Sequence, residues 1–238
     1  MLLKIILITV FLFSHGLYGQ REDIDYSVLR KQMVEEQIFH RGIADKRVLN
    51  AFLNVKRHLF VKKELRDKAY DDVTLDIGED QVVSRPYIVA VMTYAVAPDN
   101  NKKVLEIGTG SGYHAAILAE LTKYVYTIEL LEPLAKKAKK RLDSMGYKNI
   151  KFKIGNGYEG WEEYAPYDGI IVTCSEDHIP QPLINQLAVG GRLIIPIRYA
   201  LNMQELILLE KDSKGQLKKT HLIPVQAVPL IRGSEKND

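Results

Sequence analysis

The chain has 238 residues, of which 46% are hydrophobic and 26% charged, an ordinary balance for a globular protein with one substantial core. Its formal net charge of +3 is too small to indicate a nucleic-acid partner. Cys174 is the only cysteine, so an intramolecular disulfide is excluded. The six histidines are scattered, with no pair at metal-ligand spacing near a carboxylate or the cysteine, and we expect no metal site.

The first 20 residues have the pattern of a secretory signal peptide. Lys4 precedes an apolar run over residues 5–13, and a small and polar stretch over residues 14–20 follows. The run is too short to span a bilayer and has the layout of an export signal. We expect cleavage near Gly19 and export of a mature chain that begins near Arg21, with no stable membrane association afterwards. The alternative for this segment is a buried helix of the domain.

The mature chain begins with a helical segment. Apolar residues at helical spacing predict helices over residues 26–53, interrupted at Arg41-Gly42, with Asp45 as the N-cap of the second. Residues 57–83 are predicted to be irregular. Pro86 fits an early position of a further helix.

From Lys103 onward, short apolar strands alternate with helices. The predicted strands are 103–107, 124–128, 150–154, 168–173 and 192–197, and the predicted helices are 112–121, 132–145 and 181–188. This alternation indicates a mainly parallel sheet covered on both faces. Two more strands, 204–210 and 219–225, form a hairpin around Lys214-Gly215 that could close the sheet with antiparallel pairing.

These elements predict an α/β protein with a doubly wound, mainly parallel sheet of seven strands, a Rossmann-like fold. We expect one domain over residues 21–238. Within it, residues 21–100 would form a helical extension and residues 101–238 the core that binds a cofactor.

A glycine-rich segment follows the first strand of the core and opens a helix. Alternating glycines let the backbone turn sharply and leave room for a ligand against the main chain. A dinucleotide site of the G-x-G-x-x-G type would need glycine at Tyr113. The G-x-G-x-G pattern, preceded by an acid, is the form seen in methyltransferases that use S-adenosylmethionine. The residues concerned are Glu106, Gly108, Thr109, Gly110, Ser111 and Gly112.

The ends of the next two strands complete the predicted cofactor site. Glu129, followed by Leu130, could accept both ribose hydroxyls, although alone it would be a solvated charge at a strand end. Asn156 and Gly157 follow the next strand at the sheet edge where such folds contact adenine, although alone they would form a turn. We assign Leu130, Asn156 and Gly157 to the cofactor site together with Glu129.

Several separate motifs follow one another along the mature chain. The most specific are residues 155–161 and 165–170, and the others are 33–37, 41–43, 55–61, 81–87, 179–180, 190–192 and 228–230. In content and in order they resemble the motifs of the protein-L-isoaspartate O-methyltransferases, and the resemblance extends over nearly all of the mature chain. The chain departs from the family at Asn156, where aspartate is typical, and at Lys56, where proline is common. It also departs at Cys174-Ser175, where we expect Cys174 to be a packed small residue rather than a nucleophile.

The resemblance implies an enzyme that transfers a methyl group from S-adenosylmethionine, without a metal, to the free carboxylate of L-isoaspartyl residues in damaged proteins and peptides. That carboxylate is ionised near neutral pH, so catalysis needs positioning and exclusion of water rather than a strong base. Ser84 matches the family's active-site serine, whose hydroxyl can donate to the carboxylate, although it could also be an ordinary helix cap. Gln204 loosely matches a family glutamine near the cofactor or substrate. We expect a monomer, and the cytoplasmic location usual for the family is the alternative to export.

Two other functions remain open. One is a different S-adenosylmethionine methyltransferase of the same fold, although the low basicity and the Ser84 loop argue against a nucleic-acid substrate. The other is a non-catalytic exported binding protein that retains the fold, because the cofactor is made in the cytoplasm and is scarce outside it. The intact glycine loop and Glu129 favour retained cofactor binding.

Overall fold

The structure is a computed structural model that describes residues 24–100, 102–200 and 203–232. The predicted signal peptide over residues 1–20 lies outside the described residues. Within the described part of the chain, no helix has the length and apolar character needed to cross a membrane.

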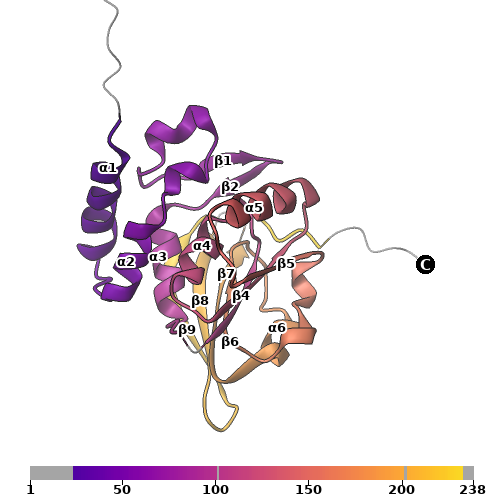
Figure 1. The fold of residues 1–238 in the computed structure, drawn as a ribbon. Coiled ribbons are helices and arrows are strands. Elements are labelled where there is room, and N and C mark those ends of the chain that lie inside the picture. The colour runs from indigo at the N-terminus through magenta and orange to yellow at the C-terminus, as the bar shows by residue number, and fades with distance from the viewer. Residues whose placement is uncertain (1–23, 101, 201–202, 233–238) are drawn as a thin grey trace, which may run out of the picture.

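A seven-stranded sheet occupies the centre of the molecule (Figure 1). Its order is β5-β4-β3-β6-β7-β8-β9, in which β3 to β7 run parallel and β8 is antiparallel to both neighbours. The strands are β3 (Lys103–Ile107), β4 (Tyr124–Glu129), β5 (Ile150–Ile154), β6 (Tyr167–Val172), β7 (Leu187–Ala200), β8 (Met203–Lys211) and β9 (Leu217–Val225). The doubly wound α/β fold and its antiparallel C-terminal hairpin are confirmed.

Alternate residues along each central strand face opposite sides of the sheet. Val104 and Val125 pack into a cluster with the N-terminal helices, whereas Leu105 and Ile128 pack into a second cluster on the other face. A strand buried on both sides in this way reads as a continuous apolar run, which is why the sequence predicts these strands well. The helices of the core are α4 (Tyr113–Ala119), α5 (Glu132–Ser144) and α6 (Gln181–Gln186).

The N-terminal segment is helical, as predicted. Helix α1 (Tyr26–Gln32) continues into a π-helical segment (Met33–Phe39), and α2 (Lys46–Asn54) and α3 (Pro86–Ala95) follow. The predicted cap of α2 is present, because the Asp45 carboxylate accepts from the Arg47 N–H at 2.9 Å.

The prediction that residues 57–83 are irregular is wrong. They contain two 3-10 helices (Arg57–Leu59 and Lys63–Lys68) and a small hairpin of β1 (Leu75–Gly78) and β2 (Gln81–Val83). The turn places Glu79 and Asp80 at φ of 55° and 54°, in the left-handed region where glycine or asparagine is usual. Strands of four and three residues around an atypical turn leave no readable period in the sequence.

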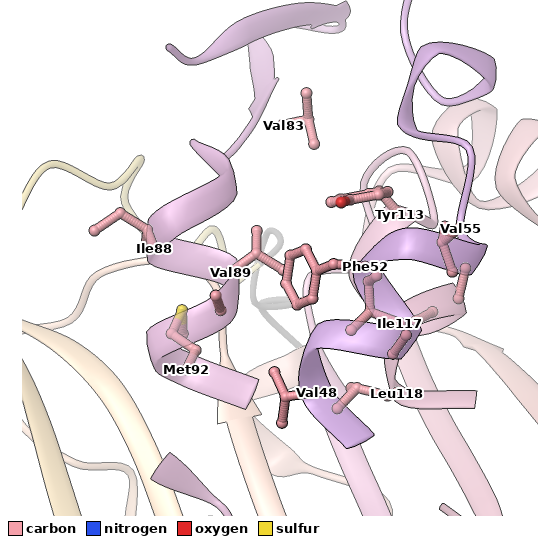
Figure 2. Packing of buried hydrophobic residues seen from close by; sticks show 14 of the residues in the cluster. Val48, Phe52, Val55, Val83, Ile88, Val89, Met92, Tyr113, Ile117 and Leu118 are labelled. Atoms are coloured by element: carbon pink, nitrogen blue, oxygen red, sulfur yellow. The ribbon is translucent and has the colours of Figure 1, made fainter. Parts of the chain in front are cut away.

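The helical layer and the sheet share one core. Figure 2 shows Phe52 of α2 lying between side chains of α3 and α4. Its ring meets that of Tyr113 edge-on, with 6.3 Å between the ring centroids. Both side chains are almost completely buried. The N-terminal helices are therefore packed directly against the helix that follows the glycine loop.

Candidate active site

A cavity lies at the carboxyl ends of β3, β4 and β6, where ligands bind in open parallel sheets. We call it the glycine-loop cavity. Its floor and walls come from three loops of the core, and two other segments close it, one from the β1–β2 hairpin and one near the C-terminus. The lining includes residues 81–84, 107–111, 128–131, 173–174 and 228–231, together with Val89, Tyr113, His114 and Gly157.

The backbone at Gly108 passes directly over the end of β6. Gly108 has φ of +91°, and an added Cβ would lie 2.3 Å from Thr173 Oγ1. That hydroxyl lies 3.0 Å from the carbonyl oxygens of both Ile107 and Gly108 and can donate to either. Both the conformation and the close approach require glycine here.

Glu129 is held at the rim of the cavity by the main chain. One carboxylate oxygen accepts from the Gly110 N–H at 2.8 Å and the other from the Leu131 N–H at 3.0 Å. A carboxylate has about four acceptor positions, so two stay available for a ligand. Glu129 and Leu130 both line the cavity, as the sequence predicts for a ribose-binding position.

Glu106 lies beneath the loop instead of lining the cavity. It is fully buried, and its Oε2 accepts from the Thr127 hydroxyl at 2.6 Å, which in turn lies 2.6 Å from the Thr109 hydroxyl. Its Oε1 has no hydrogen-bond partner among the described residues. Burial raises the pKa of the Glu106 carboxyl from its ordinary 4.5 to about 8. Glu106 therefore supports the loop from below through Thr127 and Thr109.

The turn after β5 contributes Gly157 to the cavity but not Asn156. An added Cβ on Gly157 would lie 2.3 Å from Ile107 Cγ2, so this backbone packs tightly against the end of β3. Asn156 caps the 3-10 turn Gly157–Glu159, because its Oδ1 accepts from the Tyr158 N–H at 3.0 Å. Gly112, also predicted at the site, starts α4 behind the lining residues.

Ser84 lies where two depressions meet. It lines the glycine-loop cavity, and it also lines a second groove formed by α3 and the strands β7 to β9. The N-cap position of α3 is Arg85, with no side-chain cap bond, so Ser84 is not the cap of that helix.

Gln204 lies in the second groove and not in the glycine-loop cavity. Its amide mimics a backbone partner for Ala227, accepting from the N–H at 2.7 Å and donating to the carbonyl at 3.1 Å. It thereby fixes the segment that leads to the cavity lining at residues 228–231.

His114 and the C-terminal lining were not predicted as site residues. His114 hydrogen-bonds through Nε2 to the Thr93 hydroxyl at 2.9 Å, and burial lowers its pKa to about 3, so it is neutral. Burial raises the pKa of Cys174 to about 12, in keeping with a packed residue and not a reactive thiolate. A lone histidine on a helix gives no sequence signal of a cavity.

The C-terminal segment is fastened against the cavity. The Ser175 backbone pairs with Val228 and Leu230 through bonds of 2.8 and 2.9 Å. Arg232 then forms a bidentate pair with Glu176, at 3.0 and 3.2 Å, and lies over the Tyr158 ring. We call the Arg232–Glu176 pair the latch, and it follows directly after Ile231, the last residue that lines the cavity.

One group of possible metal ligands, not foreseen from sequence spacing, occurs among the described residues. Glu176, Asp177 and His178 place ligand atoms within 4.8 Å of one another. Each already has a partner in the chain, since Glu176 pairs with Arg232 and His178 hydrogen-bonds to Asp177. These contacts account for the cluster without an ion.

Comparison with known proteins identifies a family. The family model described as protein-L-isoaspartate(D-aspartate) O-methyltransferase matches residues 28–235. A protein-L-isoaspartate O-methyltransferase of Synechococcus sp. is 49% identical over 85% of this chain and 85% of its own length. One of Picosynechococcus sp. is 51% identical over 85% of this chain and 90% of its own length.

A solved protein-L-isoaspartate O-methyltransferase has the same fold. It superposes with a TM-score of 0.76 and 30% identity, covering 84% of this chain, while this chain spans 65% of that longer one. The match in sequence and in fold extends across both the helical layer and the sheet. The chain therefore belongs to the protein-L-isoaspartate O-methyltransferase family.

Proposed function

We propose that the protein transfers the methyl group of S-adenosylmethionine to the free carboxylate of L-isoaspartyl residues in damaged proteins and peptides, with Ser84 orienting that carboxylate. The observation that carries the proposal is the place of Ser84, which borders both the glycine-loop cavity and the second groove. A residue at this junction can contact a protein substrate and a cofactor at once.

The glycine-loop cavity fits the cofactor. Glu129 keeps two acceptor positions for the ribose hydroxyls, and Gly108 and Gly157, which carry no side chain, line the cavity. When bound there, S-adenosylmethionine supplies a methyl group activated by a positively charged sulfur. We expect the adenine to lie beside the turn at Gly157, which Asn156 caps from behind the cavity lining.

The titratable side chains that line the cavity suit a nucleophile that needs no base. His114 is neutral with a pKa of about 3, and Cys174 is protonated with a pKa of about 12. An isoaspartyl carboxylate is ionised at neutral pH, so holding it in line and excluding water suffice. The Ser84 hydroxyl can donate one charge-assisted hydrogen bond to it.

The decisive experiment measures transfer from labelled S-adenosylmethionine to an isoaspartyl peptide and to its normal aspartyl twin, with protein beginning at Arg21. We expect base-labile methylation of the isoaspartyl peptide alone, and a fall of ~10- to 100-fold in kcat/KM for Ser84→Ala, the loss expected for one hydrogen bond to a charged group. Cofactor binding without transfer to either peptide would indicate a different methyl acceptor. Failure to bind the cofactor would indicate a non-catalytic protein.

We also propose that the protein is exported and acts as a monomer. The support for export is the signal-like pattern of Lys4 and the apolar run over residues 5–13. Expression of the full chain with a C-terminal tag, followed by fractionation and N-terminal sequencing, should give a mature form that begins near Arg21 outside the cytoplasm. A cytoplasmic protein that keeps Lys4 would contradict it, and light scattering of the mature form would test the monomer.

A further inference from the structure

Arg57 is a fully buried cation with no carboxylate within ion-pair distance in the described part of the chain. It lies in the 3-10 helix Arg57–Leu59, none of its side chain is exposed, and it forms no ion pair among the described residues. Its Nε donates to the Ala69 carbonyl at 2.8 Å and its Nη2 to the Ser84 carbonyl at 2.7 Å. Its Nη1 has no hydrogen-bond partner in the part of the chain that the structure describes.

Such a charge is costly to bury. A guanidinium loses its hydration on burial, and a well-packed apolar residue of similar volume is often at least as good for stability. Two backbone carbonyls accept from the guanidinium and the face of Tyr113 lies against it, while the Asp72 carboxylate adds a Coulombic attraction without forming an ion pair. Arg57 is therefore better explained by what it holds than by its contribution to stability.

Arg57 contacts two residues that line the glycine-loop cavity from different segments, Ser84 and Tyr113. The Ser84 carbonyl belongs to the link between β2 and α3, where Pro86 has no N–H to donate. On the other side the guanidinium lies over the ring of Tyr113, 4.7 Å from its centroid, and Tyr113 directly follows the glycine loop. A single planar group thus spans from the Ser84 loop to the first residue of α4.

We propose that Arg57 is a positioning residue that sets the place of Ser84 relative to the glycine-loop cavity. By fixing the Ser84 carbonyl it fixes the origin of the Ser84 hydroxyl. Because Arg57 also contacts Tyr113, the position of the Ser84 hydroxyl is fixed relative to the glycine loop. In-line transfer depends on this separation, because misplacement of a reacting group by about 1 Å can cost on the order of 100-fold in rate. The inference rests on the proposed role of Ser84.

The test compares Arg57→Met and Arg57→Lys with a matched control, Arg30→Met. Arg30 also donates to a backbone carbonyl, that of Leu53 at 2.6 Å, and to the Tyr70 hydroxyl, but it makes no bond to the Ser84 loop. For Arg57→Met we expect kcat/KM for an isoaspartyl peptide to fall at least ~10-fold, while the Kd for S-adenosylhomocysteine changes less than ~5-fold. Arg57→Lys should recover part of the loss, because an ammonium can still donate to the carbonyls. Arg30→Met should lower the thermal midpoint but leave kcat/KM within about twofold.

A double-mutant cycle separates positioning from a general effect on folding. If Arg57 acts through the Ser84 hydroxyl, Arg57→Met should cost less than ~3-fold in a Ser84→Ala background. An equal loss in both backgrounds, or a parallel loss of S-adenosylhomocysteine binding, would overturn the inference. Should Arg57→Met fail to fold, Arg57→Lys enters the same cycle with the same criterion.

Failure of the proposed function gives a different result. A wild-type protein without isoaspartyl activity, or a Ser84→Ala variant as active as the wild type, refutes the proposed role of Ser84. Either result also overturns the inference about Arg57, because that inference requires the Ser84 hydroxyl to orient the substrate. Full activity of Arg57→Met beside a strongly impaired Ser84→Ala overturns the inference alone.

Discussion

At the residue scale, Gly108 combines a left-handed backbone conformation with a close approach to Thr173 in the lining of the glycine-loop cavity. Gly108→Ala would require a left-handed alanine and a Cβ 2.3 Å from Thr173 Oγ1, so either the Thr173 side chain or the loop must move. We expect the Kd for S-adenosylhomocysteine, measured by calorimetry, to rise at least ~100-fold.

Gly146→Ala is the matched control for Gly108→Ala. Gly146 has a similar φ of +87°, but nothing lies within 4 Å of an added Cβ. It should lose about 1 kcal/mol of stability from the backbone conformation and keep its affinity for S-adenosylhomocysteine. Equal effects of the two substitutions on affinity would mean that the glycine loop does not contact the cofactor.

A substitution at Asn156 is expected to increase the affinity for the cofactor. Its Oδ1 already caps the turn at the Tyr158 N–H, and its other terminal group is a donor that cannot accept from an adenine amino group. Asn156→Asp keeps the cap and supplies a second acceptor. We expect S-adenosylmethionine affinity to improve ~3- to 10-fold, the worth of about one hydrogen bond. Unchanged or weaker binding would place the adenine elsewhere.

The pKa of Glu106 predicts a pH-dependent stability. Below its ordinary pKa of 4.5 the carboxyl is protonated in both states, and the shift has no effect. Between pH 4.5 and about 8 the unfolded chain releases a proton that the folded protein keeps, so the free energy of unfolding falls as pH rises. Glu106→Gln titrates in neither state. Its stability relative to wild type should therefore increase by at least ~2 kcal/mol from pH 5 to pH 8.5 in urea unfolding.

The wild type is the control for Glu106→Gln at each pH, because the other titrating groups are common to both proteins. A difference between the two free energies of unfolding that does not vary with pH would mean that Glu106 is ionised in the folded state.

At the scale of elements, the C-terminal segment closes the glycine-loop cavity and Arg232 holds its end. Arg232→Met removes the bidentate pair with Glu176, beside the lining residue Ile231. We expect S-adenosylhomocysteine to dissociate ~3- to 10-fold faster in stopped-flow displacement, because one partly buried charged pair restrains the segment.

Arg192→Met is the control for the latch. It removes another arginine–glutamate pair, 3.1 Å from Glu210, with side-chain exposure of 39% against 46% for Arg232. That pair lies away from the cavity and should leave the dissociation rate unchanged. Equal acceleration in both variants would argue against a latch.

At the scale of the whole molecule, Phe52 joins the helical layer to the glycine-loop helix (Figure 2). We expect residues 21–238 to unfold as one domain, and Phe52→Ala to cost about 3–5 kcal/mol of a single transition. Far-UV circular dichroism follows the helices. The fluorescence of Trp161, the only tryptophan, follows the face of the sheet opposite to the N-terminal helices. The two probes should give coincident unfolding curves in wild type and variant. Separate transitions would mean that the helical layer and the sheet are independent units.

The sequence by itself determined the order of elements, the parallel sheet and the position of the glycine loop and Glu129 at one edge of that sheet. These features are local: buried parallel strands are continuous apolar runs, and Gly108 and Glu129 each stand at the end of such a run. The β1–β2 hairpin was missed because its strands are short and Glu79 and Asp80 form an atypical turn.

Only the tertiary structure decided what surrounds the glycine-loop cavity. It placed Glu106 beneath the loop, Gln204 in a neighbouring groove, and His114 in the cavity wall. Arg57 and Ser84 lie 27 positions apart, and residues 228–231 reach the cavity from the far end of the chain. Contacts of this kind depend on how the helical layer packs against the sheet. The periodicity of one sequence segment therefore cannot predict them.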